Sequence, residues 1–384
     1  MTTLKVVVDS LADPKRIGVG RYTEELTRQL IAVAPPDCDV VGIVSAISED
    51  DTERVRMLLP GLADLTIMPL SRGKLRRAWQ AGITSVPGTA MSDTGMIHAP
   101  GLLAPLAKHD RLNDVGTQTV VTIHDVAAWT HPDTLTPPKA AWIRAMAKRA
   151  RKFADAIVVP THAVAAELGS IMDFGDRIRV IGGAVSPKLV TPVDADARAE
   201  RLELPERYIL TVGTLAPGKG LDALITSLAH EDSADLPLLI AGPAGWGEFD
   251  VASVAAAAGV APDRVRTLGF LADADLAAAI DRATVFAYPS ITEGFGLPVV
   301  EAFSFGTPVV HSDSPAVVEV AAGAGIAVDS GDSAGYPERL AQAIASVAGD
   351  SALAERLRFQ GLDRAGAFSW QDSAEKVWQL HADL

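Results

Sequence analysis

Two carboxylates and a glycine-containing loop lie within one short stretch, ITEGFGLPVVEAFSFG (291–306). Seven residues separate Glu293 from Glu301. Beside a bound anion, the natural partners of carboxylates are neutral donors such as sugar or ribose hydroxyls. The alternative is that each glutamate is a solvated surface charge, which is the usual role of a single glutamate. The pairing of the two with a Gly-Phe-Gly loop favours a ligand site.

Backbone amides beside these carboxylates are placed to bind an anion. The apolar run 283–290 predicts a buried parallel strand, and 297–305 predicts a helix. The loop between them brings the amides of Phe295, Gly296 and Leu297 to the helix N-terminus. Free N–H groups and the helix dipole both favour a phosphate there. An anion cradle flanked by acceptors of hydroxyl groups predicts a nucleotide-sugar site.

The spacing of the two glutamates resembles the donor-site motif of the retaining glycosyltransferases of family 4 (glycosyl transferases group 1), which have the GT-B architecture. Further stretches that look like this family are GVGRY (18–22), TIHD (122–125), VGTLAPGKG (212–220), IAGPAGWG (240–247) and FSW (368–370). The resemblance covers nearly the whole chain. It implies two Rossmann-like domains with doubly wound parallel sheets, which face each other across a cleft, and a C-terminal helix that crosses back to the first domain.

The resemblance also implies roles for individual residues. The first loop, with Gly18 and Gly20, lies under the donor phosphates and precedes a helix over about 22–33. His124, followed by Asp125, contacts the transferred sugar, although a lone histidine is more often structural.

In the second domain, Lys219 is expected at a helix start, where it would meet a diphosphate as a point charge. The resemblance implies that Glu293 would hold sugar hydroxyls and that Glu301 would hold the ribose. Gly213 and Thr214 belong to the donor-binding loops.

Gly242 also follows a predicted strand, in a loop expected to line the nucleotide base pocket. The family often has an arginine where this chain has Thr214 or Gly218, and this departure bears on how the diphosphate is held.

The elements that must position these residues alternate between strands and helices. Strands are expected at about 4–9, 39–45, 65–68, 96–98, 119–124, 156–160 and 179–181. Such alternation predicts a parallel doubly wound sheet, whose ligands bind outside the carboxyl ends of the strands. His124 and Asp125 follow the apolar run 120–123 and therefore lie at such an end.

A chain of 384 residues is too long for a typical single core, which suggests two domains. Periodicity lapses near 183–200, and a second alternating region begins at Tyr208. We therefore expect an acceptor-binding domain over 1–190, completed by a returning helix at 369–384, and a donor-binding domain over 191–368.

Composition excludes several classes of protein. The net charge of −14 argues against a general nucleic-acid binder. The single cysteine, Cys38, excludes an intrachain disulfide and a cysteine-based zinc site. The N-terminus lacks the order of a secretory signal, and no apolar stretch reaches about 18 residues, so a cytoplasmic protein is expected.

No metal or other cofactor is expected. Two Asp-x-Asp patterns, 194–196 and 273–275, could suggest a metal site. The first lies in the predicted linker, and the second lies where an acidic N-cap would begin a helix.

One basic cluster, SRGKLRRAW (71–79), combines four cations with a tryptophan. It would suit an anionic membrane surface or an acidic lipid-linked acceptor, which allows peripheral contact with the inner membrane surface. A solvated helix face explains the same pattern equally well.

These observations predict a retaining, metal-independent glycosyltransferase that moves a hexose from a nucleotide-sugar to a hydroxyl of a glycan or lipid-linked acceptor. The motifs most resemble mannosyltransferase-like members, so GDP-mannose is the leading donor, with UDP-glucose, UDP-N-acetylglucosamine and dTDP-rhamnose as alternatives. The rival from another class is a non-catalytic sugar-nucleotide-binding accessory protein of glycan assembly.

Overall fold

The computed structural model describes residues 2–14, 17–84, 95–110, 116–245, 247 and 249–384. The chain forms two compact units. Unit 1 contains Met1–Thr130, Pro137–Gly183 and Ser369–Leu384, and unit 2 contains His131–Thr136 and Ala184–Phe368. The short segment 131–136 thus joins unit 2 although the chain on both sides of it belongs to unit 1.

Unit 1 is built on a seven-stranded sheet with the order β3-β2-β1-β4-β5-β6-β7, in which each pairing is parallel. Its strands are β1 Thr2–Val7, β2 Cys38–Val44, β3 Asp64–Ile67, β4 Gly95–Ala99, β5 Thr117–Thr122, β6 Ala156–Val159 and β7 Ile178–Val180. All residues of β5 and β6 are buried, as expected for strands covered on both faces. The order reverses between β1 and β4, which is where such sheets bind ligands.

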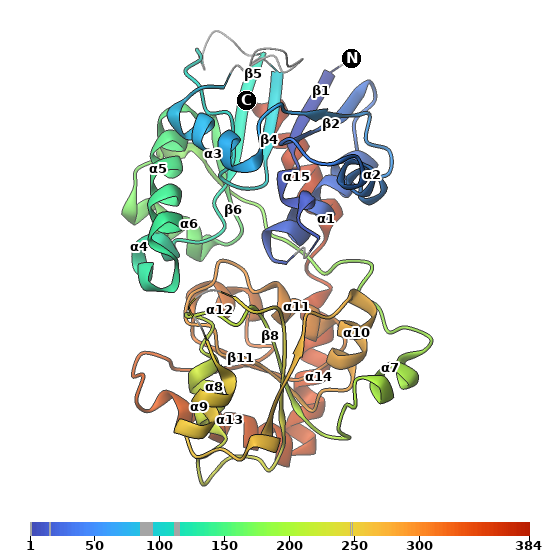
Figure 1. Ribbon diagram of the computed structural model, residues 1–384, viewed down its shortest axis with the longest axis vertical. Helices are drawn as coiled ribbons and strands as arrows, with labels where there is room; N and C mark the ends of the chain where they lie inside the picture. Colours follow the sequence, from blue (N-terminus) through green and yellow to red (C-terminus); the bar gives the residue numbers. More distant parts are fainter. Residues whose placement is uncertain (1, 15–16, 85–94, 111–115, 246, 248) are drawn as a thin grey trace. The chain divides into compact units, whose positions relative to one another are not determined.

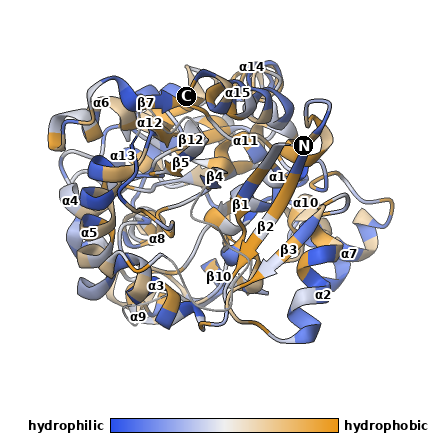
Figure 2. Ribbon diagram, turned by 90° about the horizontal axis from the view of Figure 1, so that it is seen from above, coloured by the Kyte–Doolittle hydropathy of each residue, from blue (hydrophilic) through white to orange (hydrophobic). Residues whose placement is uncertain are grey.

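Helices cover this sheet. They are α1 Val19–Ala32, α2 Glu49–Leu58, α3 Arg72–Ala81, α4 Ala127–Thr130, α5 Pro137–Phe153, α6 His162–Ile171 and α15 Trp370–Asp383, with 3-10 turns η1 Asp9–Ala12 and η3 Gly175–Arg177. The start of α2 is set by Ser48, whose side chain accepts a hydrogen bond from the Asp51 amide. Figure 2 shows β1 and β2 in hydrophobic colours and α2 in mostly hydrophilic ones, which fits the single buried residue of α2, Val55.

The last helix returns to the first unit, as the sequence predicts. α15 runs beside α1 (Figure 1), and the Trp378 indole N–H donates to the Leu30 carbonyl over 3.1 Å. The Ser369 side chain caps α15 by accepting from the Asp372 amide. The C-terminal helix is therefore a structural part of unit 1.

Unit 2 repeats the architecture with a six-stranded parallel sheet of order β10-β9-β8-β11-β12-β13. Its strands are β8 Ile209–Val212, β9 Leu238–Ala241, β10 Val265–Gly269, β11 Val285–Tyr288, β12 Val309–Ser312 and β13 Ile326–Val328. Its helices are α7 Ala195–Arg201, α8 Leu221–Ser227, α9 Val251–Ala257, α10 Asp273–Asp281, α11 Leu297–Ser304, α12 Pro315–Ala321, α13 Tyr336–Gly349 and α14 Ser351–Ala365, with 3-10 turns η2 Pro132–Thr134 and η4 Pro262–Arg264. The two sheets confirm the predicted α/β fold with two Rossmann-like parts.

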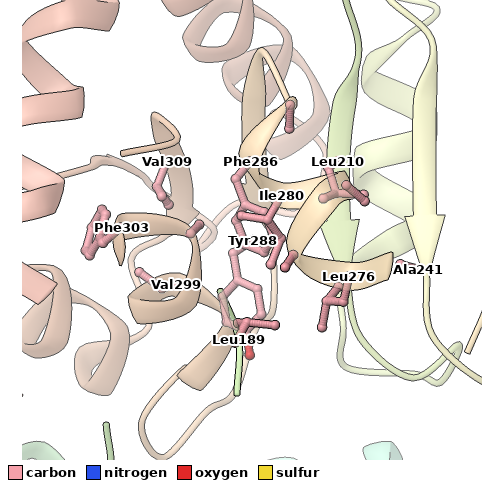
Figure 3. Close-up of a cluster of buried hydrophobic side chains, with 14 of the residues drawn as sticks. Leu189, Leu210, Ala241, Leu276, Ile280, Phe286, Tyr288, Val299, Phe303 and Val309 are labelled. Atoms are coloured by element: carbon pink, nitrogen blue, oxygen red, sulfur yellow. The ribbon is translucent and has the colours of Figure 1, made fainter. Parts of the chain in front are cut away.

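One face of the second sheet fixes the glutamate-containing stretch. Phe286 and Tyr288 of β11 pack with Val299 and Phe303 of α11 in one buried cluster (Figure 3). Burial of such side chains stabilises a fold by about 1.5–3 kcal/mol each. The loop between β11 and α11 is therefore anchored at both ends by the core.

Candidate functional site

The loop after β11 ends in a glycine that starts a helix. Gly296 is the N-cap of α11 and has a left-handed backbone, with φ 85° and ψ 51°. Such a φ strains other residues but not glycine. Leu297 is the first helical residue and Pro298 lies in the first turn, where its missing N–H costs nothing. The amides of Phe295, Gly296 and Leu297 thus lie at a helix N-terminus, as the sequence predicts.

Glu293 lies in this loop as a mostly buried carboxylate. Its Oε1 accepts a hydrogen bond from the Ser290 hydroxyl over 2.7 Å and forms an ion pair with the Lys219 ammonium. Burial alone raises the pKa of Glu293, but the charge and hydrogen bond of Lys219, together with hydrogen bonds from Ser290 and Tyr288, hold that pKa below its ordinary value. Glu293 is therefore an ionised acceptor at neutral pH.

Glu301 lies in α11 and is only 3% exposed. The reading of Glu301 as a solvated helix charge is therefore wrong. A buried carboxylate needs compensating donors or charges, and Glu301 therefore differs from an ordinary solvated glutamate.

The loops after β8 and β11 are locked together, and this explains why Lys219 meets Glu293. The Ile291 amide donates to the Gly218 carbonyl over 3.0 Å, and the Ser290 hydroxyl lies 3.2 Å from the same carbonyl. Gly220, the N-cap of α8, approaches the backbone of Pro289 so closely that a Cβ there would lie 2.1 Å from the Pro289 carbonyl oxygen.

Gly218 explains one departure from the family pattern. Its φ is +85°, and a Cβ there would lie 2.6 Å from the Thr134 Cγ2. An arginine at this position would meet both backbone strain and a steric clash. Lys219 is therefore the cation of this loop. Position 218, which precedes it, packs closely against Thr134 and has no room for a side chain.

Gly213 and Gly242, which the sequence predicts to lie in donor-binding loops, have different surroundings. A Cβ on Gly242 would lie 1.9 Å from the Gly213 carbonyl oxygen, whereas Gly213 has open space around its own Cβ position. Gly242 therefore serves the close packing of two strand ends. Thr214, which follows Gly213, is half-buried.

The two Asp-x-Asp patterns are bound by arginines. Asp275 forms ion pairs with Arg198 and Arg201, and Asp194 accepts from Arg198 Nε over 2.7 Å. The predicted acidic N-cap of the helix near 273 is wrong in detail, because α10 begins at Asp273 after Ala272 as N-cap. Within the described part of the chain, no group of three or more His, Cys, Asp or Glu residues is placed to hold a metal ion.

Unit 1 holds a cavity of about 380 Å³ at the carboxyl ends of β1 and β5. Gly20, His124 and Asp125 line it. Gly20 lies within the first turn of α1, not in the preceding loop, because the helix begins at Val19 instead of near 22. Gly18 is the N-cap of that helix, with φ 48° and open space around its Cβ position.

His124 has a defined orientation in this cavity. Its Nε2 lies 2.8 Å from the Pro100 carbonyl, which can only accept, so Nε2 carries the hydrogen. Burial lowers the pKa of His124, against the opposing effects of the Pro100 carbonyl and the Asp125 charge. A neutral ring in this tautomer leaves Nδ1 as an acceptor. The Asp125 carboxylate accepts from the Ala127 amide over 2.9 Å.

The predicted site residues thus form two groups. Lys219, Glu293 and Glu301 belong to unit 2, and His124 and Asp125 belong to unit 1. Sequence reasoning did not single out Ser290 and Tyr288, which hydrogen-bond to Glu293, or Asp9, which lines the cavity of unit 1 with His124. Asp9 follows β1 as His124 follows β5, so its position after a strand was an available signal.

Two doubly wound parallel-sheet units, with polar residues at the carboxyl ends of their strands, define the GT-B class of glycosyltransferase. The family described as Glycosyl transferases group 1 matches residues 193–362, and the one described as Glycosyltransferase Family 4 matches residues 17–189. The chain therefore belongs to glycosyltransferase family 4 (glycosyl transferases group 1) and is a glycosyltransferase.

Individual relatives agree with this class. The O-antigen chain mannosyltransferase B of Escherichia coli is 28% identical over 262 residues, which cover 66% of this chain and 68% of that protein. A D-inositol 3-phosphate glycosyltransferase of Nocardioides sp. is 30% identical over 250 residues, covering 59% of this chain and 53% of that protein. The structure of Anabaena Alr3699/HepE with UDP-glucose matches all of both chains with a TM-score of 0.74 at 17% identity, which shows the fold alone.

None of the helices in the described part of the chain is long and apolar enough to cross a membrane.

Proposed function

We propose that this chain is a retaining, metal-independent mannosyltransferase that moves mannose from GDP-mannose to a hydroxyl of a glycan or lipid-linked acceptor. The observation that carries the proposal is the buried Glu293 carboxylate paired with Lys219 beside the N-terminus of α11. It puts an acceptor for sugar hydroxyls and a cation next to one anion-binding helix end. The relatives named mannosyltransferases support mannose as the transferred sugar.

In this proposal the protein stabilises charge on the departing diphosphate. Lys219 and the amides at the start of α11 supply the positive potential that a metal ion supplies in other transferases. The bond between the anomeric carbon and the phosphate oxygen breaks, the acceptor oxygen bonds to the same face, and the leaving phosphate takes the acceptor proton. No protein nucleophile is required.

The binding roles follow from position and chemistry. Glu293 accepts from hydroxyls of the transferred sugar and Glu301 accepts from the ribose. His124 contacts the transferred sugar through its unprotonated Nδ1.

The test is donor hydrolysis without acceptor. The protein is mixed separately with GDP-mannose, UDP-glucose, UDP-N-acetylglucosamine and dTDP-rhamnose, with and without EDTA, and free nucleotide is followed by mass spectrometry. We expect slow release of GDP from GDP-mannose that EDTA does not change. Release from another donor would replace the proposed donor, and loss of release with EDTA would contradict metal independence.

The rival function, a non-catalytic sugar-nucleotide binder, is favoured by one observation. Gly218 leaves no room for the arginine that the family often carries before its lysine. A nucleotide-dependent thermal shift without any nucleotide release would select this rival.

We also propose that the protein works at the cytoplasmic face of a membrane through the cations of α3. Trp79 contributes nothing to that surface, because it is 0% exposed. The exposed cations Lys74 and Arg77 remain as the contact. Co-sedimentation with anionic but not neutral liposomes is expected, and a Lys74→Glu/Arg77→Glu variant should remain in the supernatant. Equal sedimentation of both proteins would contradict the proposal.

A further inference from the structure

Three aromatic rings from distant parts of the chain meet at His124. Tyr22 belongs to α1, His124 closely follows β5, and Trp370 is the first residue of α15. The proposed chemistry uses His124 alone and gives no role to the other two rings. Each ring comes from one of the stretches noted in the sequence, which are GVGRY (18–22), TIHD (122–125) and FSW (368–370).

The rings form a chain of edge-to-face contacts within unit 1. The ring centroids of Tyr22 and His124 lie 4.8 Å apart with an interplanar angle of 85°. Those of Tyr22 and Trp370 lie 5.4 Å apart with an interplanar angle of 69°. At such distances and angles aromatic pairs attract each other beyond the effect of their burial. Tyr22 therefore contacts both other rings, and a change at Trp370 can reach His124 through it.

His124 needs this support because its own hydrogen bond fixes only one end of the ring. Its Nε2 donates to the Pro100 carbonyl over 2.8 Å, and this bond alone would let the ring tilt about Nε2. The edge-to-face contact with Tyr22 fixes the plane of the ring as well. The two contacts together set the direction in which Nδ1 presents its lone pair.

Tyr22 and Trp370 are themselves held firmly in place. Each is only 4% exposed. The Ser369 side chain caps the first turn of α15, and the Ser373 hydroxyl donates to the Gly182 carbonyl over 3.0 Å. These two contacts fix the start of α15, where Trp370 lies. The indole can therefore serve as a fixed support for the Tyr22 ring.

We infer that Tyr22 and Trp370 are positioning residues that act on the reaction through His124. They hold the imidazole with Nε2 on the Pro100 carbonyl and with Nδ1 presented as the acceptor for the transferred sugar. The returning helix α15 therefore contributes to the site as well as to the core of unit 1. This inference rests on the proposed function, because that function makes His124 a contact of the transferred sugar.

The first test is a double-mutant cycle on donor hydrolysis, with kcat and KM measured separately. Tyr22→Leu and Trp370→Leu each remove a ring and should lower kcat about tenfold, the scale of a lost aromatic contact. The donor KM should change less, because the proposed nucleotide contacts belong to unit 2. In a His124→Gln background the same two substitutions should have no further effect on kcat, because the ring that they position is gone.

Conservative variants separate the loss of a ring from other effects of substitution. Tyr22→Phe and Trp370→Phe keep an aromatic ring and should restore most of the kcat that the leucine variants lose. Trp378→Leu is the matched control, because it removes the same side chain about two turns further along α15, where the indole donates to the Leu30 carbonyl. It should lower the melting temperature but leave kcat unchanged.

A second readout does not depend on turnover. Proton–nitrogen correlation NMR of protein with isotope-labelled histidines reports which ring nitrogen of His124 carries the hydrogen, and His124→Gln identifies the signal. We expect the hydrogen on Nε2 in the wild type, in Tyr22→Phe and in Trp378→Leu. Tyr22→Leu and Trp370→Leu should show exchange between the two tautomers.

Three results would overturn the inference: an equal loss of kcat in Trp378→Leu, an undiminished loss in the His124→Gln background, or an unchanged His124 signal in both leucine variants. If the wild type and both leucine variants hydrolyse the donor at the same rate, the inference fails while the proposed function stands. If no donor is hydrolysed but the tautomer changes as expected, the proposed function fails and the positioning of His124 stands.

Discussion

The two glutamates of the candidate site, Glu293 and Glu301, have different surroundings. Glu293 is held ionised by Lys219, Ser290 and Tyr288, whereas Glu301 is 3% exposed within α11. The sequence pattern pairs these two glutamates by spacing alone. Only the packing of β11 against α11 shows that Glu301 is not a surface charge.

Glu301→Gln tests the ribose role at this scale. Replacing a charged acceptor by a neutral one should raise the donor KM about tenfold, with a smaller effect on kcat, since it weakens a hydrogen bond to a charged group. The measurement is steady-state donor hydrolysis. Glu355→Gln, at an exposed position on α14, is the control and should leave both constants unchanged. An unaltered donor KM in Glu301→Gln would rule out the role.

Lys219→Met should shift the pH dependence of activity. The pKa of Glu293 is lowered in the fold, so its ionised form persists down to pH values below the ordinary range of a glutamate. Burial raises the pKa of Glu293, and without the charge of Lys219 less opposes this effect, so the pKa of Glu293 rises. The acidic limb of the pH profile of kcat/KM for donor hydrolysis should therefore move to higher pH, besides an overall loss of rate. A limb that stays in place would show that Lys219 does not control this carboxylate.

At the scale of elements, the parallel strands follow from apolar runs, and most were predictable to within about two residues. The start of α1 was not, because Gly18 acts as an N-cap with positive φ, and Gly20 therefore lies in the helix. The segment 131–136 was not predictable either, since its place in unit 2 depends on contacts such as Thr134 with Gly218.

The loop after β8 offers a stability test. Gly218→Ala should lower the free energy of unfolding by about 1–3 kcal/mol, because it combines positive φ with a clash against Thr134. Gly213→Ala, in the same loop but with open space and no positive φ, should change it by less than about 0.5 kcal/mol. Urea unfolding of the two variants gives the comparison. Equal stabilities of the Gly218→Ala and Gly213→Ala variants would contradict this expectation, because they would mean that Thr134 can move away from the added methyl group at no cost.

The contact of α15 with β4 should make stability depend on pH. His98 and His381 are buried with ring centroids 5.7 Å apart, and burial lowers the pKa of His381 to about 4 and that of His98 well below its ordinary value. Both groups bind protons more weakly in the folded chain than in the unfolded one. Their contribution to stability is therefore fully present above about pH 6.5 and is lost as pH falls toward 4.

We expect His381→Gln to reduce the loss of unfolding free energy between pH 7.5 and pH 5.5 by about 1 kcal/mol relative to the wild type. Urea denaturation at the two pH values measures it. His162→Gln, at an exposed histidine of unit 1, should follow the wild type. An identical pH dependence in His381→Gln and the wild type would contradict the assignment.

On the scale of the whole molecule, the class of enzyme was predictable because its motifs are local. His124 closely follows β5, whereas Glu293 and Lys219 lie in the loops that lead from β11 to α11 and from β8 to α8, so all three are near the carboxyl ends of parallel strands. The cavity of unit 1 was not predictable, because the elements that line it, η1, α3 and α5, are far apart in the chain and come together only when they pack on the first sheet.

The central claim is that Glu293 takes part in transfer from a nucleotide-sugar. The most direct test compares GDP release from GDP-mannose by the wild type and by Glu293→Gln, followed by mass spectrometry. We predict release by the wild type and a rate on the order of 100-fold lower in the variant, as for loss of one preorganised electrostatic contact. Equal rates in both proteins, or no release together with no thermal shift from any of the four donors, would contradict the account.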